Sequence, residues 1–138
     1  MKLLTKNTDY AIRALLVLAK ERDSYLSARD ISKIQGIPYQ FLRRILQKLI
    51  KNGLVKSREG GGGGFKINKN PNAIGVIDII RIFQGNIQFA ECMFRKQLCG
   101  NRATCVLRKE IKRIEKLVQR EFKGIAISKL LKRTMQRG

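Results

Sequence analysis

The sequence predicts a mostly α-helical protein: a winged helix-turn-helix with a small β-hairpin wing, followed by a long C-terminal dimerisation helix. Three patterns predict this class. Apolar residues recur at helical spacing in the first third, an alternating pattern flanks a glycine run in the middle, and one long apolar stripe occupies the last third. Because 138 residues favour one compact domain, we expect residues 1–70 to form the winged helix-turn-helix. Residues 71–138 should hold a helix, a cysteine loop and the dimerisation helix.

Two helices are expected before the turn of the motif. Apolar residues recur at helical spacing between Thr8 and Lys20, so a first helix is predicted there. Ser27 and Asp30 have the spacing of a capping box, in which a side chain at each end bonds a free backbone N–H. A short second helix therefore begins after Ser27, and Gly36 ends it as a C-cap glycine.

A third helix follows the turn at Gly36. Pro38 is expected in its first turn, where the missing N–H costs nothing, and Asn52-Gly53 ends it. Four apolar residues at helical spacing face inward: Leu42, Ile45, Leu46 and Leu49. Two helices joined by a tight, glycine-containing turn are typical of a helix-turn-helix.

A β-hairpin is predicted after the third helix. Residues 54–58 and 65–69 alternate apolar and polar side chains, and five consecutive glycines separate them. A phosphate-binding P-loop would need Lys-Ser or Lys-Thr after the last glycine, and a dinucleotide-binding loop would need a helix beyond it. Neither follows, so the segment is read as the wing of a winged helix.

The charge points to a polyanionic partner. Thirty Lys and Arg against ten Asp and Glu give a net charge of +20. Nucleic acid is the leading partner, because each neutralised phosphate releases condensed counterions. No stretch approaches the roughly 20 apolar residues that span a membrane, and the N-terminus lacks the features of a signal peptide. We therefore expect a cytoplasmic protein with no membrane partner. The sequence contains no histidine, and no nucleophile–base pair indicates an enzyme.

The third helix is the predicted recognition helix, because the second helix of this motif enters the major groove of DNA. Arginine suits the edge of guanine and glutamine that of adenine. Lysines later in the helix suit phosphates, and tip glycines let the backbone approach a groove or phosphate row closely. A protein-binding winged helix, a merely floppy glycine turn and an RNA-associated basic protein are the alternatives. The candidate DNA-binding residues are Ser27, Tyr39, Gln40, Arg43, Arg44, Lys48, Arg58, Gly60, Gly61 and Gly62.

The last third of the chain predicts self-association. A fourth helix is expected from Ile74 to Phe83, and a short terminal helix from Ser128 to Met135. Between them, one apolar stripe steps by three and four: Leu107, Ile111, Ile114, Val118, Phe122 and Ile125. A domain this small covers only part of such a stripe, so a homodimer is the economical expectation.

Three cysteines, Cys92, Cys99 and Cys105, lie between the predicted fourth helix and the long apolar stripe. Thiols in a cytoplasmic protein stay reduced, so we expect metal or redox chemistry rather than disulfides. Zinc prefers four ligands at closer spacing, whereas iron–sulfur clusters accept wider loops and one non-cysteine ligand. An iron–sulfur cluster is thus favoured, with zinc, redox-active thiols and inert thiols as alternatives.

Taken together, these motifs resemble the iron–sulfur winged-helix transcription regulators that include IscR, NsrR and CymR. The matching segments are residues 4–13, residues 31–37, residues 42–55, the Gly60–Phe65 wing, and residues 77–80 ahead of the three cysteines. The resemblance covers nearly the whole chain, and the motifs occur in the family's order. It implies a homodimeric regulator or repressor that binds a partly palindromic double-stranded DNA operator. It also implies that a 2Fe-2S or 4Fe-4S cluster modulates that binding, with a cluster-free thiol-redox or partner-sensing regulator as the alternative.

Three departures from the family pattern bear on the site. One is that Pro38 replaces a frequent serine, which removes one possible base or phosphate contact. IscR-like members place a histidine three residues after the last cysteine, where this chain has Arg108. NsrR-like members use an acidic residue, supplied across the dimer, at the position of Asp9. Asp9 is therefore the candidate fourth ligand, and an ordinary helix-start aspartate is the alternative. Many members also carry arginine where Glu59 stands, so Arg58 is the candidate substitute in the wing.

Overall fold

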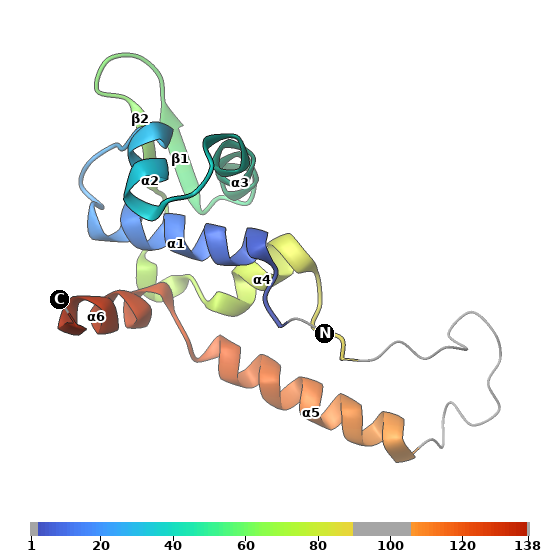
Figure 1. Ribbon diagram of the computed structural model, residues 1–138. Helices are drawn as coiled ribbons and strands as arrows, with labels where there is room; N and C mark the ends of the chain where they lie inside the picture. The colour runs from blue at the N-terminus through green and yellow to red at the C-terminus, as the bar shows by residue number, and fades with distance from the viewer. Residues whose placement is uncertain (1–2, 90–105, 138) are drawn as a thin grey trace.

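The computed structural model describes residues 3–89 and 106–137. The predicted class, mostly helical with a two-stranded antiparallel hairpin, is confirmed. The elements in chain order (Figure 1) are α1 (Lys6–Lys20), α2 (Ala28–Gln35), α3 (Tyr39–Lys51), β1 (Val55–Arg58), β2 (Gly64–Ile67), the 3-10 helix η1 (Pro71–Ala73), α4 (Val76–Gln84), α5 (Val106–Lys123) and α6 (Ile127–Arg137).

Helix α1 lies at the centre, with α2, α3 and the hairpin on one side and α4 and α6 on the other (Figure 1). It can do so because it buries side chains on more than one side. Ala11, Ala14, Leu15 and Leu18 are fully buried, and the two alanines leave room for neighbouring helices. The Thr5 hydroxyl caps the helix by accepting a hydrogen bond from the Thr8 N–H at 3.3 Å. One hydrophobic cluster therefore runs from α1 to both sides.

Helices α2 and α3 form the predicted helix-turn-helix. The Ser27 hydroxyl accepts from the Asp30 N–H at 3.1 Å, and Gly36 takes a left-handed conformation with φ +66°. The apolar side of α3 is buried as its spacing predicts. The predicted place of Pro38 is wrong by one position. Its ψ of 131° is not helical, so Pro38 is the N-cap, and its carbonyl accepts from the Leu42 N–H at 3.0 Å.

The wing has an additional backbone pairing, here called the Leu26–Phe65 rung, that the sequence pattern did not predict. Strands β1 and β2 pair antiparallel, with Val55 opposite Ile67. On the other edge of β2, Leu26 and Phe65 exchange two backbone hydrogen bonds of 2.9 and 2.7 Å. Gly64 sits against this rung with φ +137°, and a Cβ there would overlap the Leu26 carbonyl. The last glycine of the run is thus required by the fold.

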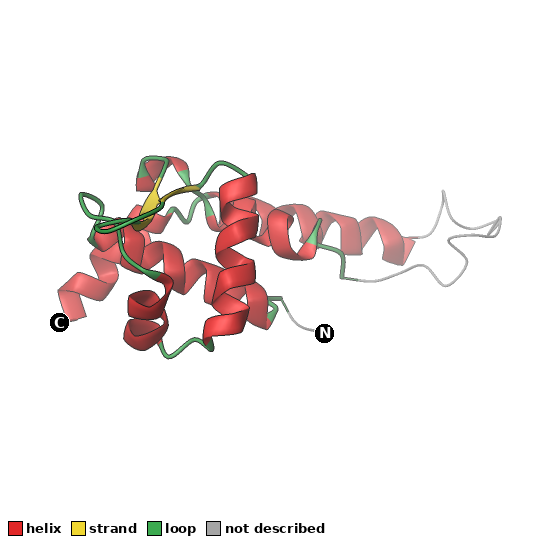
Figure 2. Cartoon of the chain, turned by 90° about the horizontal axis from the view of Figure 1, so that it is seen from above, coloured by secondary structure: helices red, strands yellow, loops and turns green. Residues whose placement is uncertain are grey.

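Backbone hydrogen bonds just beyond the C-terminal end of helix α5 join it to the core. The Val76 N–H donates to the Ile125 carbonyl at 2.8 Å, and the Ile127 N–H donates to the Ile74 carbonyl at 2.9 Å. Figure 2 shows α5 extending away from the other helices. None of its residues is fully buried, although Val118 and Phe122 pack against the core. The expectation that the fold covers only part of its apolar stripe is confirmed.

Candidate nucleic-acid interface

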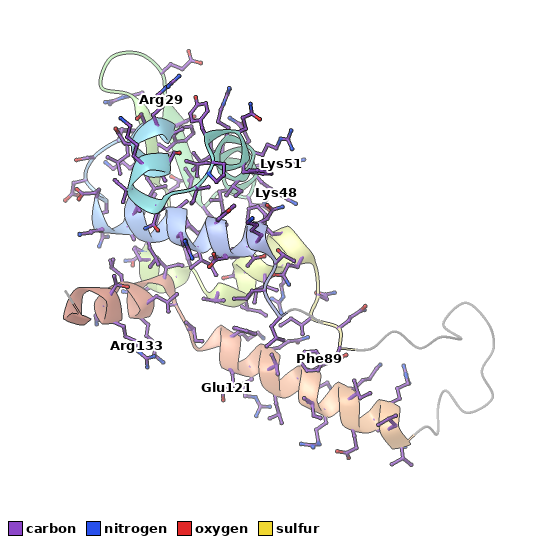
Figure 3. The ribbon with its side chains drawn as sticks, viewed as in Figure 1. Arg29, Lys48, Lys51, Phe89, Glu121 and Arg133 are labelled. Carbon is purple, nitrogen blue, oxygen red and sulfur yellow. The ribbon has the colours of Figure 1, made fainter. Side chains whose placement is uncertain are left out.

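The exposed side of α3 is strongly basic. Its four buried apolar residues face the core, and these polar residues of the same helix lie in solvent: Gln40, Arg43, Arg44, Gln47, Lys48 and Lys51. No acidic residue occurs in α3. Figure 3 shows Lys48 and Lys51 on α3 and Arg29 on α2, all on the opposite side of α1 from Arg133 of α6. An acid-free helix face of this kind suits the polyanionic surface of a nucleic acid.

Tyr39 joins the two helices of the motif at this surface. The Arg29 guanidinium carbon lies 5.2 Å from the centre of the Tyr39 ring, and that of Arg43 lies 5.8 Å from it. Both distances are in the range of a cation–π contact. The predicted pair Tyr39 and Arg43 is therefore brought together, and Arg29 of α2 joins them. An arginine held by a ring loses less side-chain freedom when it binds a base or a phosphate.

The wing residues form a second group, attached to the start of α2. Ser27 caps α2 directly after Leu26, whose backbone pairs with the wing. The Arg58 side chain donates to the Gly62 carbonyl at 3.0 Å and lies 4.4 Å from the centre of the Tyr25 ring. A Cβ at Gly60 or Gly61 would meet nothing within 4 Å, which leaves the tip open to a partner.

Lys48 contacts an aromatic ring that sequence reasoning did not predict. Its ammonium nitrogen lies 5.2 Å from the centre of the Phe83 ring on α4. Lys48 was expected to hold a phosphate, and it remains exposed. The contact therefore ties the C-terminal half of the recognition helix to the helix that precedes the cysteine segment.

The three cysteines lie outside the described residues, and the two flanks of their segment are described. Helix α4 ends at Gln84, and α5 begins at Val106, directly after Cys105. Among residues 3–89 and 106–137, no group of three His, Cys, Asp or Glu side chains could hold a metal ion. The predicted cysteine loop and its ligands stay predictions.

The chain on the N-terminal side of that segment is held by hydrogen bonds to two polar side chains. The Gln84 amide accepts from the Thr5 N–H at 2.8 Å and donates to the Leu3 carbonyl at 3.0 Å. The Phe89 N–H donates to the Glu115 carboxylate of α5 at 2.9 Å, and Figure 3 shows Phe89 beside α5. The end of α4 is therefore held to the start of α1, and the chain beyond it to α5.

Asp9 lies in the first turn of α1. Its carboxylate forms an ion pair with Arg13 at 3.1 Å, and 45% of its side chain is exposed. An exposed ion pair of this kind contributes about 0–1 kcal/mol, so it leaves the carboxylate available to another partner at little cost. Both the ligand role and the ordinary helix-start role remain compatible with this position.

Five side chains with a place in this surface or its flanks were not identified from the sequence: Tyr25, Arg29, Phe83, Gln84 and Glu115. Each acts through a contact between elements distant in sequence, which no local periodicity records. The one signal present in the sequence was the location of Tyr25 and Arg29 on either side of the α2 cap.

Comparison with known proteins decides the family. Residues 4–133 match the model of the Rrf2 family, described as an iron-dependent transcriptional regulator. The chain belongs to the Rrf2 family. Rrf2-family relatives support this along most of the chain. It is 30% identical over 111 residues to the HTH-type transcriptional repressor NsrR of Streptomyces coelicolor, covering 79% of this chain and 74% of that one. It is 35% identical over 98 residues to the regulator IscR of Pectobacterium atrosepticum, covering 70% and 60%.

Solved structures agree with this Rrf2 assignment. The structure of T. potens IscR matches with a TM-score of 0.77 and 25% identity, covering 97% of this chain and 88% of that one. CymR, the global cysteine regulator of B. subtilis, matches with a TM-score of 0.77 and 24% identity, covering 96% and 98%; it supports the fold alone. The recognised family and the winged-helix fold are thus confirmed.

Membership of the Rrf2 family makes this chain a DNA-binding transcriptional regulator, and the expectation that it is not an enzyme is confirmed. Within the described ranges, none of the helices is both long and apolar enough to span a membrane. The roles of individual residues, the cluster and the homodimer stay predictions.

Arg43→Ala should lower sequence discrimination more than general affinity, because Arg43 lies early in the recognition helix beside Tyr39. Against a duplex that the protein itself selects from a random pool, we expect a loss of about 1–3 kcal/mol, with little change on mixed-sequence DNA. Lys48→Ala is the matched control, which should weaken both duplexes alike. Fluorescence anisotropy measures both. Equal losses for Arg43→Ala on the two duplexes would assign Arg43 to phosphate instead.

Proposed function

We propose that this Rrf2-family protein is a homodimeric transcriptional repressor whose operator binding is modulated by an iron–sulfur cluster. Cys92, Cys99 and Cys105 would hold the cluster, with Asp9 as the candidate fourth ligand. The observation that carries the proposal concerns the end of α4, which precedes all three cysteines in the sequence and touches both the recognition helix and the start of α1.

The donor set fits this cofactor. Thiolates are the ligands that iron–sulfur clusters use, and the absence of histidine from the sequence leaves a carboxylate as a natural fourth donor. A bound cluster would supply iron–thiolate bonds that respond to oxidants, to nitric oxide or to iron supply. Phe83 and Gln84, at the end of α4, would carry a change in the cluster to the DNA-binding surface.

The flanking contacts provide a physical route from the cysteine segment to the DNA-binding surface. Phe83, one residue before the end of α4, lies under Lys48 of α3. Gln84 holds the backbone at Leu3 and Thr5, which is one turn before Asp9. A change in how residues 90–105 are held would therefore act on both α3 and α1. The coupling required is about 1–3 kcal/mol, comparable to a few such contacts.

Helix α5 supplies the proposed dimer contact. Leu107, Ile114 and Leu117 lie on one side of the helix and are 68%, 41% and 43% exposed in the single chain. Exposed apolar side chains at this spacing are typical of a helix that pairs with a second copy. Pairing two chains through α5 would set the separation of their recognition helices, which must be about 34–36 Å for a palindromic site.

A second candidate function uses the same thiols without a metal. A winged-helix regulator that senses thiol oxidation or a partner protein would share the DNA-binding surface and contain neither iron nor sulfide. The same cysteine segment and flanking contacts would then transmit oxidation or partner binding. Metal analysis separates the two functions.

Protein purified without oxygen should be coloured and contain iron and acid-labile sulfide, and Cys99→Ala should lose both. Iron and sulfide assays with Mössbauer spectra measure this. Colourless protein that holds one zinc ion would replace the cluster with the zinc alternative. Metal-free wild-type protein with intact DNA binding would favour the thiol-sensing function.

The same preparation tests the fourth ligand. Asp9→Ala should shift the spectrum and shorten the lifetime of the bound cluster in air, because a carboxylate ligand is lost. Asp23→Ala removes another exposed aspartate and is the matched control. Unchanged spectra and lifetime in Asp9→Ala would return Asp9 to the ordinary helix-start role.

Substituting both Ile114 and Leu117 by Gln should dissociate the homodimer. Burying an aliphatic side chain contributes about 1.5–3 kcal/mol, and each substitution counts twice in a symmetric pair, so we expect the dimer to weaken at least a hundredfold. Sedimentation velocity over a concentration series measures this. Lys112 and Lys116, both exposed on α5, give a matched double-Gln control. A dimer of undiminished affinity in the Ile114/Leu117 variant would place the interface elsewhere.

A further inference from the structure

One face of the wing gathers three cations. The strand register places Lys56 opposite Lys66 and Arg58 opposite Gly64. Since alternate residues of a strand point to the same face, Lys56, Arg58 and Lys66 share one face of the hairpin. Ile67, on the other face, is buried in the core. Like charges directly opposite each other destabilise a hairpin unless something compensates them.

A tyrosine compensates part of this repulsion. The centre of the Tyr25 ring lies 4.4 Å from the Arg58 guanidinium carbon and 5.4 Å from the Lys66 ammonium nitrogen. The ring is fixed beside the hairpin, because the next residue, Leu26, pairs with Phe65. The face of an aromatic ring attracts cations, so Tyr25 holds two of them close together.

These three cations have no acidic partner within residues 3–89 and 106–137. Among the described residues, no carboxylate forms an ion pair with Lys56, Arg58 or Lys66. Between Asp30 and Asp78 the sequence contains a single acidic residue, Glu59. Two cations held together by a ring without a counter-ion form a ready site for an anion.

We propose that Arg58 and Lys66 bind one backbone phosphate of DNA, with Tyr25 as the positioning residue. The inference uses the DNA binding of the Rrf2 family and does not depend on the proposed iron–sulfur cluster. A guanidinium presents several N–H donors in a plane, which matches a phosphate, and the ammonium of Lys66 adds a second charge.

The location of Arg58 favours a phosphate over a base. Its guanidinium donates to the Gly62 carbonyl at 3.0 Å while it lies on the Tyr25 ring. Both interactions hold the side chain against the hairpin, between the Tyr25 ring and the Gly62 carbonyl, whereas an arginine that reads a minor groove must extend beyond the tip. Arg58 and Lys66 therefore meet a phosphate beside the groove.

The salt dependence of binding tests whether the two cations share one phosphate. The full-length protein, at matched iron content, is titrated onto a mixed-sequence duplex between about 50 and 200 mM salt. The Arg58→Ala/Lys66→Ala double variant should make the log–log slope shallower by about 0.9 for each bound wing, the value for one phosphate. Arg133→Ala, an exposed arginine on α6, is the control and should leave the slope near that of the wild type.

The positioning role of Tyr25 has its own readout. Tyr25→Leu should weaken binding to the same duplex about two- to fivefold per wing, the equivalent of an exposed cation–π contact. Tyr25→Phe keeps the ring and should retain the affinity. The effect of Tyr25→Leu should vanish in the Arg58→Ala/Lys66→Ala background, whereas a general loss of structure would persist there. Thermal unfolding confirms that each variant is folded.

Three results would overturn the inference. An unchanged slope in the double variant would show that no phosphate is held, and a decrease of about 1.8 per wing would show two separate phosphates. A loss for Arg58→Ala that is confined to the duplex selected by the protein would show that Arg58 reads bases.

Discussion

The packing of α1 is the constraint on which the rest of the structure depends. Leu15 and Leu18 are fully buried, and the helix that carries them contacts α2, α3, β2, α4 and α6. The recognition helix and the helix ahead of the cysteines are therefore anchored to the same support. Cores are close-packed and adopt discrete arrangements, so a displacement on one side of α1 is felt on the other. The proposed coupling between the cysteine segment and DNA would therefore act through the α1 core and would not require direct contact between the two.

The candidate DNA-binding surface follows a second principle, in which aromatic rings hold basic side chains in place. Tyr39 gathers Arg29 and Arg43 at the start of α3, and Tyr25 gathers Arg58 and Lys66 at the wing. With a net charge of +20, the chain repels itself, and rings offset this locally without neutralising the charge. The positive charge therefore stays available to phosphates. Lys48 over Phe83 extends the same device towards α4 and links the surface to the proposed sensor segment.

Local patterns predicted the helices, the hairpin and the class of the protein, because residues such as Leu42 and Ile45 repeat at the period of the element they form. What the sequence could not predict depends on contacts between distant segments. The rung between Leu26 and Phe65 is one example, and it requires glycine at position 64, a need that the run of five glycines alone did not reveal. The Tyr25 ring and the Gln84 amide are others. Candidate metal ligands were identified by residue type and spacing, while their arrangement depends on the tertiary structure around residues 90–105.

Native-state hydrogen exchange on Leu15→Ala tests most directly whether one core supports both sides of α1. Removing this fully buried side chain should cost about 2–5 kcal/mol. If the recognition helix and the C-terminal helices share that core, amide protection should fall together in α3, α4 and α6. Leu117→Ala, on the exposed side of α5, should leave all three nearly unchanged when measured on the monomeric chain. Protection lost in α3 alone, with α4 and α6 at their wild-type values, would contradict a shared core.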